Sequence, residues 1–429
     1  MLWQEKRLRF VADLNPQVRV DLLETPDTEL SFLPMESIGE DGTLNLDRTR
    51  PVAEVRNGYS YFEDGDVAFA KVTPCFENGK GAVMGNLEGG AGFGTTELTV
   101  LRPKADTNAR FLHYVVLSER FRQLGAAAML GAGGLKRVPD EFTRDFATPW
   151  PDVSAQARIA KFLDEKTARI EALIAKKEQL LAKLSEYRYS YASSLMTRGL
   201  NPNAAIAGTS FPEVNAVPSH WSVKRLKFLG EVRSGVAKGK DLGDKDTVPV
   251  PYLRVANVQD GYVDLTEVLE IEVGQNEVSR YLLQKGDVLM NEGGDNDKLG
   301  RGTVWEGQID PCIHQNHVFA VRLFDVSLAE WVARFTSTDA ARSYFFLRSK
   351  QSTNLASINQ SNVRELPVPM PPAKERLAIL EELRRSSAAT TELIEHTQEH
   401  IARLREYRSS LISATVTGQL DVGAYKEAA

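Results

Sequence analysis

Apolar side chains recur at helical spacing in two long stretches of the chain. In residues 154–197 they fall mostly three, four or seven positions apart, and Lys, Glu and Arg fill the other positions. A second stretch repeats the pattern with Leu380, Leu383, Leu393, Ile394, Ile401, Leu404 and Leu411. A narrow apolar seam at this spacing is typical of a coiled coil. We therefore predict two long helices that pair through their seams.

The first predicted helix, residues 154–197, would be about 66 Å long at 1.5 Å per residue. A helix with so narrow an apolar face needs a partner in water. The simplest partner is the second helix of the same chain, in an antiparallel pair with a globular module at each end. Two alternatives stay open: each helix caps its own domain, or each pairs with the same helix of another copy.

The chain also contains a long internal repeat. Residues 3–10 (WQEKRLRF) and 221–228 (WSVKRLKF) agree at five of eight positions. From Pro149 and Pro369 onwards the two copies run in a constant register, and the triplet Glu-Tyr-Arg recurs at 186–188 and 406–408. Repeated Ser and Thr positions follow, and Gly199 and Gly418 stand where a helix commonly ends in a left-handed cap. The chain is thus predicted to be two copies of one unit.

Between these repeated ends, the two halves resemble one another only faintly. Short β-rich runs at 99–102, 287–290 and 318–322 alternate with Gly- and Asp-rich turns, and helical patterns follow at 110–124 and 329–347. We predict a mixed α/β (α+β) fold with a pseudo-two-fold internal repeat. The predicted parts are a first globular domain (1–150), a central helix (151–205), a second globular domain (206–370), and a C-terminal helix with tail (371–429).

Composition narrows the class of protein. The 429 residues are 42% hydrophobic and 26% charged, as in ordinary soluble proteins. No apolar run reaches the roughly 18 residues of a membrane span, and no secretion signal begins the chain, so we expect a cytoplasmic protein without membrane contact. Cys75 and Cys312 lie in no Cys/His cluster, which argues against structural zinc. The net charge of −6 weighs against nucleic-acid binding, although local basic patches coexist with acidic helices.

Motifs for catalysis are missing from the sequence. It has no Gly-x-x-x-x-Gly-Lys-Ser/Thr loop, no His-Glu-x-x-His, no Gly-x-Ser-x-Gly and no Asn/Asp-Pro-Pro-aromatic motif. The glycines of residues 89–94 lack the strand-then-helix context of a dinucleotide site and are interpreted as a turn. We therefore predict no catalytic residue, no metal and no cofactor.

The entry to each long helix carries a family pattern, Pro-x-Pro-x-x-x-x-Gln-x-x-Ile. The first copy is PWPDVSAQARI (149–159) and the second is PMPPAKERLAI (369–379). The chain in this respect resembles the specificity subunits of type I restriction–modification enzymes, over nearly its whole length. It departs from the usual Glu-Gln pair, because the first copy has Ala155-Gln156 and the second Glu375-Arg376.

The resemblance implies a non-catalytic subunit that binds double-stranded DNA. Each globular domain would be a target-recognition domain for one half of a split target, and the helices would act as a spacer that sets the gap. Two methyltransferase subunits would methylate an adenine in each half, and motor-nuclease subunits would cleave the DNA. Gln156, Glu375, Tyr187, Arg188, Tyr407 and Arg408 are the candidates for partner docking.

Polar and basic residues in loops are the candidates for DNA contact. Gln and Asn pair with adenine edges through two hydrogen bonds, whereas Lys and Arg contact phosphates and guanine. The candidates are Lys71, Lys80, Lys136, Arg137, Lys298, Arg301, His314, Gln315, Asn316, Lys350 and Gln351. Packing or solvation is the competing interpretation at each position.

Two other functions stay open. A structural rod with protein-binding end modules would have no affinity for DNA in any complex. A nuclease built on Asp, Glu and Lys would degrade DNA by itself with a divalent metal, but paired acidic motifs do not recur at equivalent positions of the two halves.

Overall fold

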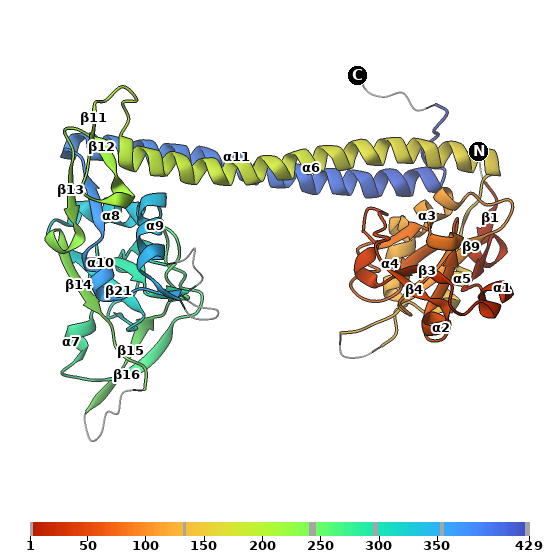
Figure 1. Ribbon diagram of the computed structural model, residues 1–429, viewed down its shortest axis with the longest axis horizontal. Coiled ribbons are helices and arrows are strands. Elements are labelled where there is room, and N and C mark those ends of the chain that lie inside the picture. The colour runs from red at the N-terminus through yellow and green to blue at the C-terminus, as the bar shows by residue number, and fades with distance from the viewer. Residues whose placement is uncertain (1–2, 132–133, 240–245, 295–298, 352–355, 425–429) are drawn as a thin grey trace. The chain divides into compact units, whose positions relative to one another are not determined.

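The computed structural model describes residues 3–131, 134–239, 246–294, 299–351 and 356–424. The chain folds as two compact units. Unit 1 contains residues 1–178 and 397–429, and unit 2 contains residues 179–396. Two long helices, α6 (Val153–Arg198) and α11 (Ala373–Val416), each contribute to both units (Figure 1). The globular part of unit 1, up to Trp150, is called module 1, and residues 206–370 of unit 2 are called module 2.

Module 1 is built on two four-stranded sheets. The first, in the order β2-β9-β6-β7, consists of β2 (Ala12–Leu14), β9 (Leu98–Pro103), β6 (Val67–Ala70) and β7 (Gly81–Val83). The second, in the order β4-β3-β8-β5, consists of β4 (Thr49–Pro51), β3 (Glu29–Leu33), β8 (Ala91–Gly94) and β5 (Ser60–Glu63). Its helices are α1 (Val20–Glu24), α2 (Val52–Val55), α3 (Ala109–Leu117), α4 (Glu119–Ala127) and α5 (Asp140–Asp145).

Module 2 repeats the first of these sheets, with the order β14-β21-β17-β19. Its strands are β14 (Gly230–Ser234), β21 (Val318–Leu323), β17 (Val288–Asn291) and β19 (Gly302–Val304). Smaller sheets contain β15 (Thr247–Leu253), β16 (Leu269–Gly274) and β20 (Ile313–His314), and also β11 (Ile206–Gly208) and β12 (Ala216–Pro218). Its helices are α7 (Val278–Tyr281), α8 (Ala329–Phe335), α9 (Asp339–Arg348) and α10 (Gln360–Arg364).

The repeated ends of each unit pair with one another. Strand β1 (Glu5–Arg7) pairs antiparallel with β10 (Ala147–Pro149), and β13 (Ser222–Arg225) pairs in the same way with β24 (Pro367–Met370). The Trp-to-Phe motif and the Pro-x-Pro motif are therefore the two sides of one ribbon at the entry to each long helix. This pairing explains why both ends of the unit recur together.

The predicted long helices are confirmed, and the first extends only one residue beyond residues 154–197 at each end. Within unit 1 they are antiparallel, because Glu178 of α6 pairs with Arg405 of α11 and Glu171, earlier on α6, pairs with Arg408. Within unit 2, Tyr191 donates a hydrogen bond to Glu382 of α11 (3.0 Å).

Part of the predicted apolar seam is wrong. Of the apolar residues that the spacing places in the seam, Ile159, Leu163 and Ile170 are buried as expected, but Leu173, Leu180 and Leu393 are 43%, 39% and 46% exposed. The apolar stripe is therefore wider than the contact between the two helices, and some of its members face outward.

The helices predicted over 110–124 and 329–347 are each two helices. Ser118 separates α3 from α4, and its extended backbone and side-chain hydroxyl cap the N-terminus of α4. Thr338 does the same between α8 and α9. Ser and Thr are good N-caps because their oxygen accepts a backbone N–H that the helix leaves unpaired.

A buried ion pair recurs in both modules. Asp66, which is 2% exposed, accepts two hydrogen bonds from Arg102, at 2.9 and 2.7 Å. Asp287, which is 1% exposed, accepts the same two bonds from Arg322. The sequence Gly-Asp-Val, which both halves share at residues 65–67 and 286–288, is thus a turn whose carboxylate binds an arginine of the neighbouring strand.

Candidate nucleic-acid interface

The ends of three strands and one loop meet at one edge of module 1, here called the hairpin edge. Lys71 follows β6, Lys80 precedes β7 and Glu97 precedes β9. The backbone of Lys71 donates to the carbonyl of Glu97 (2.8 Å), and Ala70 donates to that of Lys80 (2.9 Å). A third segment closes on them, because Arg137 forms β-bridges with both Val72 and Leu130.

Module 2 has the same edge with the same backbone bonds. Glu292 donates to the carbonyl of His317 (2.9 Å), and Asn291 donates to that of Arg301 (3.1 Å). The closing segment is a small sheet of β18 (Gly293–Gly294), β23 (Ala356–Ser357) and β22 (Lys350–Gln351). In the internal repeat, each of these module 2 residues is equivalent to the module 1 residue that makes the same backbone contact. The two hairpin edges are thus equivalent frames.

The side chains on the two frames differ. In module 1, Arg137 donates two hydrogen bonds to Glu97, at 2.8 and 2.6 Å, and these bonds lower the pKa of Glu97 below its usual value. In module 2 the counterparts of Glu97 and Arg137 are His317 and Ser357, and His317 instead pairs with Glu292. The position after the central strand is therefore basic in module 1 (Lys71) and acidic in module 2 (Glu292).

The structure brings most of the predicted DNA-contact residues to these edges. Lys71, Lys80, Lys136 and Arg137 gather in module 1, and Lys136 and Arg137 are exposed. In module 2, Lys350 and Gln351 are exposed on β22, and the half-buried Gln315 and Asn316 form the turn before β21. Lys298 lies outside the described residues. The role of all these residues in DNA contact stays a prediction.

His314, one of the predicted DNA-contact residues, is buried below the hairpin edge of module 2. It is 1% exposed, and its Nδ1 lies 2.6 Å from the carbonyl oxygen of Val318. Burial lowers its pKa to about 4. A neutral ring packed under the turn presents no surface to DNA in this structure, so we remove it from the candidate interface.

One of the predicted docking residues, Gln156, is also a correction. Gln156 is fully buried: its amide donates to the carbonyls of Pro151 (2.9 Å) and Asp106 (3.2 Å), and its oxygen accepts from the backbone of Asn108 (2.8 Å). Gln156 thus holds the loop before α3 against the start of α6. Glu375 accepts hydrogen bonds from His220 (2.7 Å) and from the indole of Trp221 (3.1 Å), and its side chain is 26% exposed, so its role in docking stays a prediction.

The remaining docking candidates divide by residue type. Tyr187 and Tyr407, at equivalent positions of α6 and α11, are 51% and 48% exposed. Arg408 is half-buried and paired with Glu171. The guanidinium of Arg188 lies 5.3 Å from the ring centre of Tyr189.

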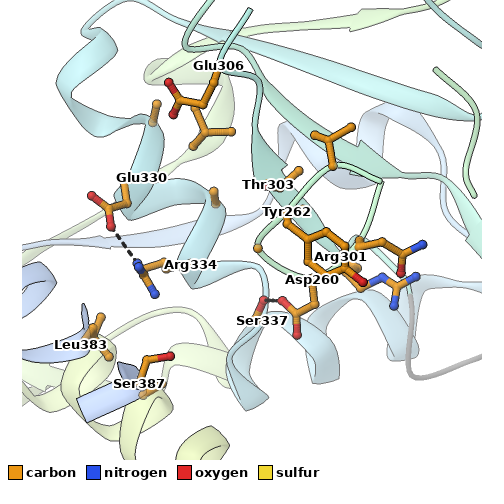
Figure 2. Close-up of a pocket in the computed structure, with 18 of the residues that line it drawn as sticks. Asp260, Tyr262, Arg301, Thr303, Glu306, Glu330, Arg334, Ser337, Leu383 and Ser387 are labelled. Carbon is orange, nitrogen blue, oxygen red and sulfur yellow. Dashed lines mark hydrogen bonds and ion pairs between the residues drawn. The ribbon is translucent and has the colours of Figure 1, made fainter. Parts of the chain in front are cut away.

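Arg188 and Arg301 both line a cleft of about 1290 Å³ inside unit 2. Figure 2 shows Arg301 beside Tyr262 and Asp260 at one side of this cleft, and Glu330 with Arg334 on α8 at another. The Nε atom of Arg301 is buried without a partner in the described part of the chain. An equivalent cleft in unit 1, lined by Asp41, Arg110 and Arg408 among others, is smaller, about 280 Å³.

Sequence reasoning missed the acidic members of the edges. Glu97 and Glu292 are not among the candidates, because basic and amide side chains are the common partners of phosphates and base edges. A position-by-position comparison of the two copies of the repeat would have found them, since both stand beside predicted strands. Across the described residues, no group of three or more His, Cys, Asp or Glu side chains is placed to hold a metal ion. That part of the chain also contains no helix that is long and apolar enough to cross a membrane.

Comparison with known proteins finds similarity to specificity subunits of type I restriction enzymes. Residues 218–403 match the family model of the type I restriction modification DNA specificity domain. Over 160 residues the chain is 38% identical to the type I restriction enzyme EcoEI specificity subunit of Escherichia coli, which covers 37% of this chain and 26% of that protein. It is 24% identical over 326 residues to the EcoKI specificity subunit of Escherichia coli strain K12, covering 75% and 68% of the two chains. The chain thus matches about a quarter of the length of the first of these relatives.

Solved structures share the fold over the whole chain. A chain from a study of complex assembly and conformational transition of the type I R-M system has a TM-score of 0.73 at 16% identity, covering 97% of this chain and 98% of that one. The HsdS subunit of Thermoanaerobacter tengcongensis has a TM-score of 0.58 at 16% identity, covering 98% and 97%. The mixed α/β fold with long paired helices that the sequence predicts is therefore confirmed.

Proposed function

We infer that this chain is a specificity subunit of the type I restriction–modification family, that it reads DNA with its two modules, and that it leaves catalysis to partner subunits. Each module would recognise one half of a split target through its hairpin edge. The observation that carries this proposal is the pair of equivalent frames with different side chains. Two modules that recognise different DNA sequences need the same orientation on DNA but different side-chain contacts to it.

Contacts at the hairpin edges would divide into two kinds. Lys71, Lys80, Lys136 and Lys350 are suited to phosphates, which fix position without reading sequence. Gln315, Asn316 and Gln351 are suited to base edges, because an amide forms two hydrogen bonds with adenine. Glu292 accepts hydrogen bonds only, so the edge of module 2 would favour a cytosine amino group where module 1 offers Lys71.

The paired helices would act as the spacer between the half-sites. Both α6 and α11 contribute to both units. Deleting one heptad from each helix in register keeps the seam in phase and should change the permitted gap, with each half-site unchanged. A changed half-site with an unchanged gap would contradict the spacer role.

Two methyltransferase subunits would dock on equivalent exposed positions of the two helices. Tyr187 and Tyr407 are the matched tyrosines, and Leu173 and Leu393, which are also equivalent in the repeat, are exposed leucines. Large exposed apolar side chains on an otherwise polar helix are suited to a protein partner. Motor-nuclease subunits would join this complex for cleavage.

The decisive experiment is base-resolved methylation sequencing. One host carries this chain with a cognate methyltransferase subunit, and the control host carries that subunit alone. Methyl-adenine in a single split motif, present only with this chain, is the expected result. No new methylation, with both proteins soluble and associated, would contradict the proposal and favour a scaffold that does not read DNA.

A second experiment assigns the half-sites to the modules. Lys350→Leu with Gln351→Gly gives module 2 the two residues that module 1 has at the equivalent positions, and it alters the edge of module 2 alone. A change confined to one half of the methylated motif is expected. A change in both halves would mean that the modules do not read independently.

A further inference from the structure

Each module attaches to the long helices through some contacts that are the same in both units. The hydroxyl of Ser413 on α11 accepts the backbone N–H of Glu119 (2.9 Å), and that of Ser193 on α6 accepts the N–H of Asp339 (3.1 Å). Trp3 packs against Gly418 just past α11, and Trp221 packs against Gly199 just past α6. Either module would fit either set of these contacts, so they do not select which helix end a module takes.

A second set of contacts differs between the units. In unit 1, Arg110 of α3 donates to Asp164 of α6, with Nε 3.1 Å from Oδ1. Tyr114, one turn further along α3, donates to the same carboxylate oxygen at 2.7 Å. Module 1 therefore presents donors to a negative charge on the helix.

In unit 2 the signs are reversed. Glu330 of α8 accepts hydrogen bonds from Arg384 of α11, at 3.1 and 2.7 Å. Arg334, one turn further along α8, donates to Glu330 at 2.9 Å, and Figure 2 shows this pair at the cleft. Burial opposes the charge on Glu330, but the bonds from Arg384 and Arg334 outweigh it and lower the pKa. Module 2 therefore presents a negative charge to a positive one.

These two sets occupy the same places in the repeat. Arg110 is equivalent to Glu330, Tyr114 to Arg334, and Asp164 to Arg384, in the register that also aligns Pro149 with Pro369. Module 1 on the start of α11 would set Arg110 against Arg384. Module 2 on the start of α6 would set Glu330 against Asp164. Each mismatch replaces an attraction with a like-charge contact, and such repulsion is an effective way to reject a wrong partner.

We propose that these two charge-reversed clamps, Arg110–Tyr114–Asp164 and Glu330–Arg334–Arg384, make each module recognise the helix that follows it in the chain. The rejected partner is the equivalent helix start of the other unit in a second copy of the chain, because two or three residues join each module to its own helix. The shared Ser and Trp–Gly contacts attach the modules, and the clamps make attachment to the following helix more stable than attachment to the other one. This inference does not depend on DNA recognition.

The test uses two variants of the full chain with the same amino-acid composition and the same net charge as the wild type. The mismatched variant exchanges only the helix residues, Asp164→Arg with Arg384→Asp. The rematched variant adds Arg110→Glu, Tyr114→Arg, Glu330→Arg and Arg334→Tyr, so that each unit carries the clamp of the other. Amide hydrogen exchange is measured in α3 and α8, which reports how often each module opens from the helices.

We expect exchange in α3 and α8 to be about fivefold faster in the mismatched variant, because two partly exposed ion pairs become two repulsive contacts. The rematched variant should return to within about twofold of wild type. Unchanged exchange in the mismatched variant would overturn the proposal. Equally fast exchange in both variants would also overturn it, because it would mean that residues 164 and 384 act through their own helices.

A neutralising series keeps the test decisive if the mismatched variant does not fold. Asp164→Asn alone should speed exchange in α3, and adding Arg110→Gln to it should have little further effect, because the partner is already lost. The same pattern is expected for Arg384→Gln and Glu330→Gln in α8. Fully additive effects in both units would show that the charges do not act as pairs.

Discussion

At the hairpin edge, unit 1 places Lys71, Glu97 and Arg137 where unit 2 places Glu292, His317 and Ser357. The backbone bonds that hold these positions are the same in both units. The units differ where side chains face solvent and agree where backbone groups need partners. After duplication, the exposed side chains can therefore differ between the units while the backbone hydrogen bonds and the fold stay the same.

Below the surface the two units are alike. Asp66 with Arg102 and Asp287 with Arg322 make the same buried two-bond contact. Each carboxylate also accepts a backbone N–H, from Glu63 and from Gln284, both at 2.8 Å. The comparison thus predicts equal responses from equivalent buried positions and unequal responses from equivalent exposed ones.

The largest effect is expected from breaking the buried ion pairs. Asp66→Ala should destabilise unit 1, and Asp287→Ala unit 2, by about 3 kcal/mol each, because each removes a buried carboxylate that accepts two hydrogen bonds from an arginine and one from a backbone N–H. Hydrogen exchange of the slowest amides of β6 and β17 measures the stability of each unit separately. The control is Glu36→Ala, which breaks the exposed pair with Arg48 (3.3 Å) and should have an effect of about 0.5 kcal/mol or less. Effects that differ by more than about 2 kcal/mol between the units would break the comparison.

Acid should weaken both units through different histidines. Burial lowers the pKa of His113 in unit 1 and of His314 in unit 2 to about 4, from 6.5. Between these values the unfolded chain binds a proton that the folded chain does not, so stability is complete above pH 6.5 and falls as the pH drops towards 4. We expect a loss of about 2–3 kcal/mol for each histidine across this window.

Unfolding measured at pH 7.5, 6 and 4.5 checks the pH dependence. His113→Asn should flatten the profile of unit 1 alone, and His314→Asn that of unit 2 alone. His220→Asn is the control, since its side chain is half exposed. A profile that stays steep in both single variants would show that other groups cause the acid sensitivity.

The sequence predicts the frame of this protein better than its contacts. The bounds of α6 can be predicted from the apolar spacing because the helix is long and its pattern repeats over many turns. The helix breaks at Ser118 and Thr338 cannot be predicted in this way, because apolar residues continue at helical spacing across both N-cap residues. At the hairpin edge, Lys71, Lys80 and Arg137 were found as basic residues, but their meeting depends on strand order, which local sequence does not contain.

The wrong site residues share one physical cause. Gln156 is a candidate because it belongs to the family pattern at the helix entry, and His314 because it adjoins Gln315 and Asn316. Both instead satisfy backbone groups inside the module: Gln156 bonds three of them, and His314 contacts the carbonyl of Val318. A buried polar side chain with backbone partners cannot be told from an exposed one until the loop around it is placed.

A smaller and symmetric effect is expected at the helix ends. Gly199 and Gly418 have φ of 75° and 76°, and an added Cβ would lie 3.1 and 3.0 Å from the rings of Trp221 and Trp3. Gly199→Ala and Gly418→Ala should each destabilise their unit by about 1–2 kcal/mol, from backbone strain and from displacement of the indole.

Glycines with open surroundings separate these two causes. Gly58 and Gly261 both have φ of 82°, with no atom within 4 Å of an added Cβ. Gly58→Ala and Gly261→Ala should show the backbone strain alone, about 1 kcal/mol. If Gly58→Ala and Gly261→Ala destabilise their units as much as Gly199→Ala and Gly418→Ala do, the tryptophan contact contributes nothing to attachment of the modules.

The smallest effect sharpens the comparison at the edges themselves. Lys136→Gln in module 1 and Lys350→Gln in module 2 should each weaken DNA binding by the chain with its methyltransferase subunit about fivefold near 0.15 M salt. Each should also lower the slope of log K against log salt by about 0.9, the value for one lost phosphate contact. Fluorescence anisotropy from about 0.05 to 0.2 M salt measures both quantities.

Lys104 and Lys285 are the controls, because they lie at the opposite ends of β9 and β17. Lys104→Gln and Lys285→Gln should therefore leave the slope unchanged. A changed slope with the controls and not with Lys136 or Lys350 would move the DNA-binding surface to the other end of the sheets, and the matched hairpin edges would then be a feature of folding alone.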